Sequence, residues 1–302
     1  MIRTLDQMVE KVISLQKKQR IAVAWGQDPN TIGAVHKAVG QGFAEALLVG
    51  DPDMIKHVCE IEGLDPSQFT IIASAGESDA AAEAVRMAVS GEADIVMKGL
   101  VNTDVFLKAV MDKEKGLMNP GATLAYVGAV QIPEYHKLLF LSDLAVIPFP
   151  DLDQLGAMAE YAIEMAGKFG IAIPKIALLS ATEKVSAHFP VTSDYVEMKK
   201  NAARGSFGDC IMDGPLDLFL ACDSESVRIK GVNTPVNGDA DILLFPSLES
   251  ANLFYKALMM FANGELAGIL RGTRKPVVVM SRSESEKSKY YCIALSCLMA
   301  GD

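Results

Sequence analysis

Residues 275–289 read KPVVVMSRSESEKSK, and the fold class that we expect follows from the pattern of this stretch. Four apolar residues, Val277 to Met280, follow a Lys-Pro pair and give way to polar residues at Ser281. A helical pattern then begins at about Ser285. An apolar run, a polar loop and a helix start in this order are typical of a buried parallel strand in an open α/β sheet.

The polar loop after this strand is a candidate anion site. Open α/β sheets bind ligands at the carboxyl ends of their strands, where the next helix start offers N–H groups and a positive dipole. Arg282 adds a fixed charge and a fork of donors that matches a phosphate or a developing oxyanion, and Ser281 adds a hydroxyl beside it. The alternative interpretation is a solvated loop with a surface arginine.

Composition and charge narrow the class of protein. The chain has 302 residues, 50% of them hydrophobic, which predicts about two packed domains. Its formal net charge of −10 argues against nucleic-acid binding and against an anionic membrane surface. No apolar run reaches the roughly 18 residues of a membrane helix, and the N-terminus lacks a signal-peptide core. The five cysteines are scattered without CxxC spacing, so we expect reduced thiols in a cytoplasmic protein.

Strand-like and helical patterns alternate through the first hundred residues, which predicts a parallel sheet covered on both faces. From Gly121 the pattern shifts, and short β-like runs at 123–130 and 137–140 indicate a hairpin or the edge of a second domain. The other expected strands are 20–25, 44–49, 70–73, 93–97, 175–179, 210–213, 241–245 and 277–280.

A second polar loop follows the strand that ends at Met97. Gly99 allows close backbone approach in this loop. Asn102 or Thr103 can cap the next helix, and Lys108 lies about one turn into it. Solvent-facing charge is the alternative interpretation for Lys108 and for Lys98, which begins the loop. Two such loops at strand ends make a shared phosphate site more plausible than either loop alone.

Several common motifs are absent from the sequence. There is no GxGxxG after a strand, no GxxxxGK[ST] and no GxSxG, which weakens the dinucleotide, P-loop and hydrolase interpretations. The four histidines show no metal-ligand spacing, so we expect no metal site. Among the histidines, His188 is the candidate for lining a site, because it lies near the 182–186 loop.

An ordered set of segments resembles the phosphate acetyl/butyryltransferase family. The set covers most of the chain from about Asp94 onward, and the first ninety residues fit less distinctly. The motifs GPLD and SRSES favour the butyryl branch over acetyl-specific members. The segments are FLSDLAVIPFP (140–150), PKIALLSATEKVSA (174–187), MDGPLDLFLA (212–221), GDADILLFPSLESANLFYK (238–256) and MSRS (280–283).

The resemblance implies two α/β/α domains with a cleft between them, like the isocitrate/isopropylmalate dehydrogenase fold. Residues 1–120 and 272–302 would form the first domain, which carries the Ser-Arg loop. Residues 121–271 would form the second, which pairs subunits into a homo-oligomer, a dimer or a multiple of dimers. The implied activity is reversible transfer of a short-chain acyl group, butyryl-like or acetyl, between coenzyme A and inorganic phosphate through a ternary complex. Coenzyme A is then a substrate, with no permanently bound cofactor.

The resemblance also assigns candidate site residues. Ser281 and Arg282 match the Ser-Arg pair of the family site, where Arg282 would stabilise the tetrahedral oxyanion that either reaction direction passes through. No acyl-enzyme is required, because holding both substrates together supplies most of the advantage. The residues that match phosphate- or substrate-contacting segments are Lys98, Gly99, Asn102, Thr103, Lys108, Thr182 and Lys184.

One departure concerns the general base, which helps to form the coenzyme A thiolate because a thiol has a pKa of about 8.5. Acetyl-specific relatives place an Asp after the Arg where this chain has Ser288. We favour Glu284, one helical turn earlier on the same face, as the substitute, and Glu286 is also close. Both acids equally suit the first turn of a helix as solvated residues.

Two alternative functions remain open at this point. A metal- and NAD-dependent decarboxylating dehydrogenase of the same fold would need a cluster of Asp ligands, and no convincing cluster is present. A non-catalytic acyl-CoA-binding sensor is compatible with the departure at Ser288. Acyl-chain preference, reaction direction and oligomer size do not follow from the sequence.

Overall fold

The chain divides into two compact units in the computed structural model, which describes residues 1–281 and 284–300. Unit 1 contains Met1–Thr4 and Thr123–Leu266. Unit 2 contains Leu5–Ala122 and Ala267–Asp302, so it is assembled from two distant stretches of chain.

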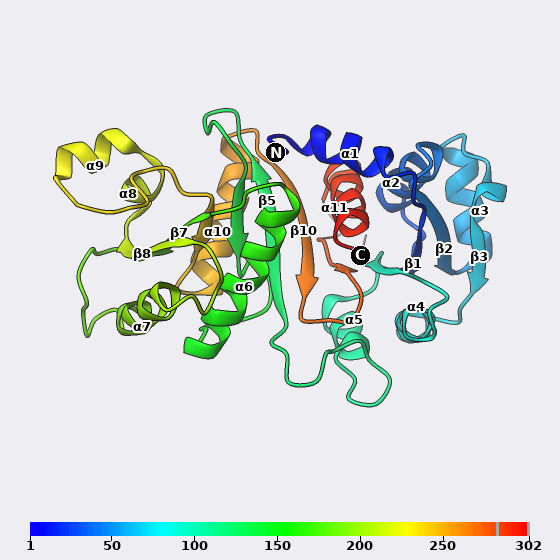
Figure 1. The fold of residues 1–302 in the computed structure, drawn as a ribbon. Coiled ribbons are helices and arrows are strands. Elements are labelled where there is room, and N and C mark those ends of the chain that lie inside the picture. The colour runs from blue at the N-terminus through cyan, green and yellow to red at the C-terminus, as the bar shows by residue number, and fades with distance from the viewer. Residues whose placement is uncertain (282–283, 301–302) are drawn as a thin grey trace. The chain divides into compact units, whose positions relative to one another are not determined.

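Unit 2 is a mixed sheet with helices on both faces (Figure 1). Its strand order is β3-β2-β1-β4-β11-β10, and all neighbours are parallel except β10 and β11. Its strands are β1 (Gln19–Ala24), β2 (Ala44–Gly50), β3 (Thr70–Ala73), β4 (Ile95–Lys98), β10 (Glu265–Arg271, whose first two residues are counted with unit 1) and β11 (Val277–Val278). Its helices are α1 (Leu5–Ser14), α2 (Pro29–Gly40), α3 (Pro52–Ile61), the 3₁₀ turn η1 (Pro66–Gln68), α4 (Glu77–Ser90), α5 (Thr103–Val110) and α11 (Glu286–Met299).

Strand β10 corrects the prediction of a purely parallel sheet, since no strand was expected at 265–271. Leu270 pairs with Val277 in antiparallel register. Only a short turn joins the two strands, and a parallel partner would need a crossover of a dozen residues or more. The expected strand at 277–280 is also shorter than predicted, because its ladder ends at Val278.

Helix α11 is the centre of the unit 2 core and packs against α1 and α2 (Figure 1). Every residue from Lys289 to Met299 is buried, as expected for a helix covered on all sides. The Tyr291 hydroxyl donates to Asp6 of α1 at 2.6 Å. Helix α11 therefore ties the C-terminal stretch to the N-terminal part of the unit.

The strands of unit 1 stand in the order β5-β6-β9-β7-β8. The hairpin predicted after Gly121 is present, because β5 and β6 pair antiparallel, and the other neighbours are parallel. Helices α8 and α9 were not predicted. The elements are β5 (Ala125–Gln131), β6 (Leu139–Ser142), α6 (Leu152–Lys168), β7 (Lys175–Leu179), α7 (Val191–Ala203), β8 (Ile211–Leu216), α8 (Leu218–Cys222), α9 (Ser224–Lys230), β9 (Ile242–Leu244) and α10 (Leu248–Phe261).

Side-chain caps fix where many of these helices begin. Asp28 starts α2 by accepting a hydrogen bond from the backbone N–H of Thr31 at 3.0 Å. Such caps satisfy N–H groups that have no partner within the helix. Side-chain caps also start α3, α6, α8, α9, α10 and α11, at Asp51, Asp151, Asp217, Asp223, Ser247 and Ser285 respectively.

Two carboxylates stabilise the unit 1 sheet. Asp143 is 2% exposed and accepts backbone N–H groups from Tyr126 and from the turn that follows it. Burial raises its pKa although these N–H groups lower it, and this buried position fits a structural acid. Asp239 lies between Lys137 and Lys175, each 2.8 Å away. Burial alone would raise its pKa, but the two ammonium groups lower it to about 2.

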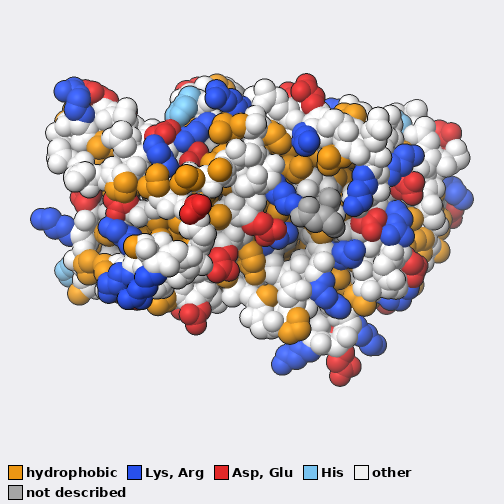
Figure 2. All heavy atoms as spheres, in the orientation of Figure 1, with side chains coloured by type: hydrophobic (Ala, Val, Ile, Leu, Met, Phe, Trp, Pro, Cys, Tyr) orange, Lys and Arg blue, Asp and Glu red, His pale blue; other side chains and the backbone are white. Residues whose placement is uncertain are grey.

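Charged side chains of both signs are interspersed over the face in Figure 2, with exposed hydrophobic side chains between them. On α10, Leu253, Met260 and Phe261 are 71%, 75% and 81% exposed. Among the described residues, no helix is both long enough and apolar enough to span a bilayer.

Candidate active site

The strand order of unit 2 marks one edge of its sheet as a ligand site. The chain runs from β1 outward through β2 to β3 and then returns to β4 on the other side of β1. Ligands of open α/β sheets bind outside the carboxyl ends of the strands at such a reversal. The loops after β1, β4 and β11 share this edge, because these three strands are parallel neighbours.

The loop after β4 is tightly built. Lys98 is 2% exposed, and its ammonium donates to the carbonyls of Gly99 and Val101, each at 3.1 Å. The Lys98 ammonium therefore points back onto its own loop and stabilises the conformation of that loop. Any Cβ at Gly99 would lie 2.5 Å from the Trp25 carbonyl oxygen, so only glycine fits where this loop crosses the end of β1.

The start of α5 is held by an acid that sequence reasoning missed. Asn102 donates its backbone N–H and its side-chain amide to Glu77 Oε2, at 2.9 and 3.0 Å. Glu77 is the first residue of α4, and an acid at a helix start carries no sequence signal for such a contact. Thr103 is the exposed first residue of α5, and Lys108 is exposed about 8 Å further along the helix axis.

The loop after β11 emerges beside the β4 loop, because Val278 is in register with Met97. Ser281 is exposed, and its carbonyl accepts the N–H of Glu284 at 3.2 Å. The candidate catalytic Arg282 lies outside the described residues.

Helix α11 then begins at a serine cap. Ser285 accepts the backbone N–H of Ser288 at 3.1 Å, and the two hydroxyls lie 3.2 Å apart. The Ser288 hydroxyl is therefore engaged with the helix cap.

A buried ion pair fastens the first turn of α11 to the start of α2. Lys289 is 3% exposed, and its ammonium lies 3.0 Å from both Asp28 Oδ1 and the Thr31 hydroxyl. The other oxygen of Asp28 is buried and has no hydrogen-bond partner among residues 1–281 and 284–300. The break after the first strand, GQDP, could have drawn attention to Asp28, whereas nothing distinguishes Lys289, because lysines are mostly exposed.

Helix α2 also contacts the loop that carries the candidate base. The side-chain amide of Asn30 donates to the Glu284 carbonyl at 3.4 Å. The Glu286 carboxylate lies over Gly33, where an added Cβ would be 2.6 Å from it. Glu286 thus covers α2, while Glu284 is half-buried within the loop after β11.

The edge as a whole suits an anionic substrate. Helices α2, α5 and α11 all begin here, and each N-terminus contributes a partial positive charge and N–H donors. Within residues 1–281 and 284–300, no group of three or more His, Cys, Asp or Glu side chains is arranged to hold a metal ion.

Thr182 and Lys184 belong to unit 1, on the loop after β7. The Thr182 hydroxyl accepts the Lys184 N–H at 3.3 Å, and Lys184 is exposed. A largely apolar pocket of about 660 Å³ adjoins this loop at the carboxyl ends of β7 and β9. Ala181 and His188 line it, together with Phe149, Leu179, Phe189, Leu218, Phe245 and Phe254.

Comparisons with known proteins agree with this arrangement. The model of the family "Phosphate acetyl/butaryl transferase" matches residues 72–297. A phosphate butyryltransferase of Clostridium acetobutylicum is 38% identical over 302 residues, covering 100% of both chains. A phosphate acetyltransferase of Thermotoga maritima is 35% identical over 97% of this chain and 99% of its own length. The crystal structure of a branched-chain phosphotransacylase from Enterococcus faecalis superposes with a TM-score of 0.81 at 30% identity, covering 93% of this chain and 99% of that one.

The chain belongs to the phosphate acetyl/butyryltransferase family. The predicted family and the predicted enzyme class, an acyltransferase, are confirmed. The dehydrogenase and sensor alternatives are not favoured by these relatives.

Proposed function

We propose that this protein transfers a short-chain acyl group reversibly between coenzyme A and inorganic phosphate through a ternary complex. The observation that carries the proposal is the shared edge of unit 2, where the Lys98 and Ser281 loops meet three helix N-termini in a chain of this family. Acyl-CoA and phosphate both carry negative charge that such an edge attracts.

The phosphate subsite is proposed at the starts of α5 and α11. Backbone N–H groups of the loops would hold the phosphate oxygens, with Thr103 and Ser281 adding hydroxyls. Because the Lys98 ammonium contacts the carbonyls of its own loop, we assign it a positioning role. Lys108 would contribute charge from the outer end of α5.

In the reaction we propose, the coenzyme A thiolate attacks the acyl-phosphate carbonyl, or phosphate attacks the thioester. Both routes form a tetrahedral oxyanion, which Arg282 would stabilise together with the Ser281 hydroxyl. Collapse of this oxyanion expels phosphate in one direction and thiolate in the other. The thiol proton has to be removed, and Glu284 is the acid we propose for this step.

The base assignment can be tested with two acids of the same loop. Glu284→Gln should lower turnover by about 100-fold or more across pH, with little change in acyl-CoA affinity. Glu286→Gln, which removes the carboxylate that lies over α2, serves as the matched control and should retain most activity. A Glu284→Gln variant with the wild-type pH–rate profile would remove Glu284 from the mechanism.

Unit 1 is proposed to contact the acyl-CoA. Its pocket beside the 182–186 loop has an apolar lining suited to an acyl chain, and Thr182 and Lys184 lie next in the chain to its Ala181 wall. We also propose that 1–120 with 272–302 and 121–271 act as two domains around a cleft, as in the isocitrate/isopropylmalate dehydrogenase fold. Limited proteolysis with and without acyl-CoA would test this: protection confined to one domain would contradict it.

The activity itself can be measured as phosphate-dependent release of thiol from acetyl-, propionyl-, butyryl- and isobutyryl-CoA, with and without a chelator. We expect release that requires phosphate and is indifferent to the chelator. Arg282→Ala should abolish it, whereas Arg204→Ala, an exposed arginine of unit 1, should not. Tight acyl-CoA binding without release from any thioester would overturn the enzyme assignment in favour of a sensor, and Ser288→Asp would then test whether the missing acid is responsible.

We further propose a cytoplasmic homodimer, or a multiple of dimers, paired through unit 1. The exposed apolar side chains of α10 support the interface, and five cysteines without a disulfide support the compartment. Phe261→Asp should dissociate the dimer in sedimentation velocity, and Met54→Asp, at an exposed methionine of unit 2, should not. A monomeric wild-type protein would contradict the assembly.

A further inference from the structure

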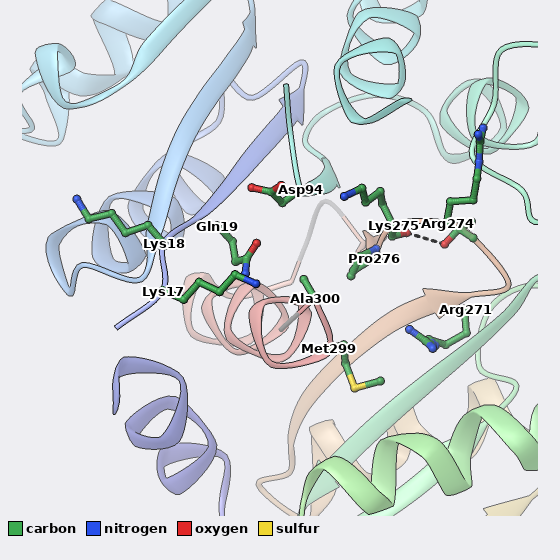
Figure 3. A pocket seen from close by; sticks show the side chains of 11 residues that line it. Lys17, Lys18, Gln19, Asp94, Arg271, Arg274, Lys275, Pro276, Met299 and Ala300 are labelled. Carbon is green, nitrogen blue, oxygen red and sulfur yellow. Dashed lines mark hydrogen bonds between the residues drawn. The ribbon is translucent and has the colours of Figure 1, made fainter. Parts of the chain in front are cut away.

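The apolar pocket of unit 1 has walls from two separate stretches of chain. Unlike the polar pocket of unit 2 in Figure 3, which charged side chains line, the pocket at the carboxyl ends of β7 and β9 is largely apolar. Ala181 and His188, from the loop after β7, line one part of it. Leu218, the first residue of α8, lines another part. The width of the pocket therefore depends on how this loop is held relative to α8.

Lys230, the last residue of α9, connects these two walls. Its ammonium donates to the Glu183 carboxylate of the loop at 2.8 Å and to the carboxylate of Asp217, which caps α8. The hydrogen bond from Lys230 lowers the pKa of Glu183, and the bonds to Asp217 and Glu183 raise the pKa of Lys230. Arg228, the other cation at this end of α9, instead donates to Glu225 of its own helix. We call the contacts of Lys230 with Glu183 and Asp217 the Lys230 bridge.

The α8 side of the Lys230 bridge is anchored to the segment that leads into β9. The backbone N–H groups of Gly238 and Ala240 donate to the carbonyls of Leu220 and Ala221, at 3.1 and 3.0 Å. An added Cβ at Gly238 would lie 2.3 Å from the backbone carbonyl carbon of Asp223, so this segment packs closely against the junction of α8 and α9. Helices α8 and α9, coloured yellow in Figure 1, therefore give the loop a fixed partner.

The loop side of the Lys230 bridge is anchored at both ends of the loop. Ser180 and Ser186 donate their backbone N–H groups to acceptors on β8 and α7, at 2.8 and 3.0 Å. Residues 181–185 lie between these anchors and include the two residues that we propose to contact acyl-CoA. Apolar burial contributes little to this part of the loop, because Val185 is 56% exposed. The contact between Glu183 and Lys230 is therefore well placed to hold it.

We propose that Lys230 is a positioning residue for acyl-CoA binding, which holds the 182–186 loop against α8. This inference rests on the proposed function, in which Thr182 and Lys184 contact the acyl-CoA. Lys230 acts through Glu183 and fixes the loop before the ligand arrives, which reduces the conformational entropy that binding has to remove. Because an ordered loop favours the bound substrate and the transition state alike, loss of the bridge should raise KM and leave kcat nearly unchanged.

Steady-state kinetics and calorimetric titration with butyryl-CoA test the proposal. Lys230→Met should raise both KM and the dissociation constant about fivefold, because two partly exposed ion pairs are lost together. The kcat for thiol release should stay within about twofold of wild type. Lys230→Arg should keep wild-type values, since a guanidinium can also donate to two carboxylates. The control Lys200→Met has the same charge change and also loses an exposed ion pair, with Glu197, and it should change KM by less than about twofold.

Glu183→Gln separates the Lys230 bridge from general charge attraction. This substitution removes a negative charge, so charge attraction alone would strengthen the binding of anionic acyl-CoA. Loss of the bridge should instead weaken binding by about threefold or more. The double variant Lys230→Met/Glu183→Gln should bind no more weakly than Lys230→Met alone, because both substitutions remove the same contact.

Two results would overturn the proposal. Wild-type affinity in Lys230→Met would show that the bridge does not position the loop. Opposite effects of Lys230→Met and Glu183→Gln on affinity would show that charge attraction is the cause. Failure of the proposed function gives a different result, in which the wild-type protein binds butyryl-CoA but releases no thiol with phosphate. The dissociation constants of the variants would still decide the role of Lys230 in that case.

Discussion

Replacement of Lys289 by methionine tests how the candidate loop is held. The side chains of Lys289 and Asp28 are 4% and 12% exposed, and their charged atoms lie 3.0 Å apart. Lys289→Met would leave the Asp28 carboxylate buried without its cation. Removing one partner of a buried pair costs about 3–5 kcal/mol, against about 0–1 kcal/mol for an exposed pair. The higher range applies here, because the pair is buried and the second oxygen of Asp28 has no hydrogen-bond partner in the described part of the chain.

A second substitution separates the charge effect from lost packing. Asp28→Asn keeps the oxygen that caps α2 but removes the negative charge. In the wild type this change should destabilise unit 2, because it leaves Lys289 buried and unmatched. In the Lys289→Met background it should instead restore at least about 1 kcal/mol, since it removes the stranded carboxylate.

Urea unfolding followed by tryptophan fluorescence provides the assay, because the single tryptophan, Trp25, lies in unit 2 close to the pair. With an m-value of about 2 kcal/mol per molar, Lys289→Met should lower the midpoint by roughly 1.5–2.5 M. Lys56→Met, at an exposed lysine of the same unit, is the control and should shift it by less than about 0.3 M. The reasoning is refuted if the two shifts are equal, or if Asp28→Asn has the same effect in both backgrounds.

Three further predictions concern other contacts. Gly99→Ala should destabilise unit 2 by about 1–3 kcal/mol in thermal unfolding, because its Cβ would meet the Trp25 carbonyl at 2.5 Å, whereas Gly76→Ala has open space and should be tolerated; equal effects would contradict the steric argument. Ser285→Ala should cost about 1 kcal/mol by removing the cap of α11, and Ser285→Asp should retain the stability if capping is the cause. Asp239 has a folded-state pKa of about 2, below the unfolded value, so its stabilisation is present above about pH 4 and lost as the pH falls through 2. Asp239→Asn should remove this acid-dependent part, at most about 1 kcal/mol because the side chain is 37% exposed, and an unchanged acid transition would count against it.

The strand ends of unit 2 were accessible from the sequence because they combine two strong local signals. Around Met97 and Val278, short apolar runs give way to polar loops and helix starts, and both runs are strands in the structure. The hairpin after Gly121 was equally local. Strand β10 was not predicted at all, and its antiparallel direction follows from the short turn that joins it to β11.

The contacts that support the candidate site were not accessible, because they join residues far apart in the chain. Lys289 meets Asp28 across 261 positions, and the exposed-lysine rule predicts the opposite environment for it. Asn102 and Glu77 are also distant in the chain, and the start of α4, where Glu77 lies, has no sequence motif that predicts their hydrogen bond. Lys98 was predicted to contact a phosphate. In the structure its ammonium donates to two carbonyls of its own loop, and sequence spacing does not determine the direction of a side chain.

The division of unit 2 between two stretches of chain has a consequence for its synthesis on the ribosome. Unit 1 contains a continuous stretch, 123–266, that leaves the exit tunnel ahead of β11 and α11. Until those elements emerge, β4 lacks its neighbour, and the faces of α1 and α2 that α11 covers are open to solvent. The N-terminal part of unit 2 therefore cannot complete its fold until the last residues have emerged, and its apolar surface is exposed until then. During this interval, aggregation or chaperone binding competes with folding.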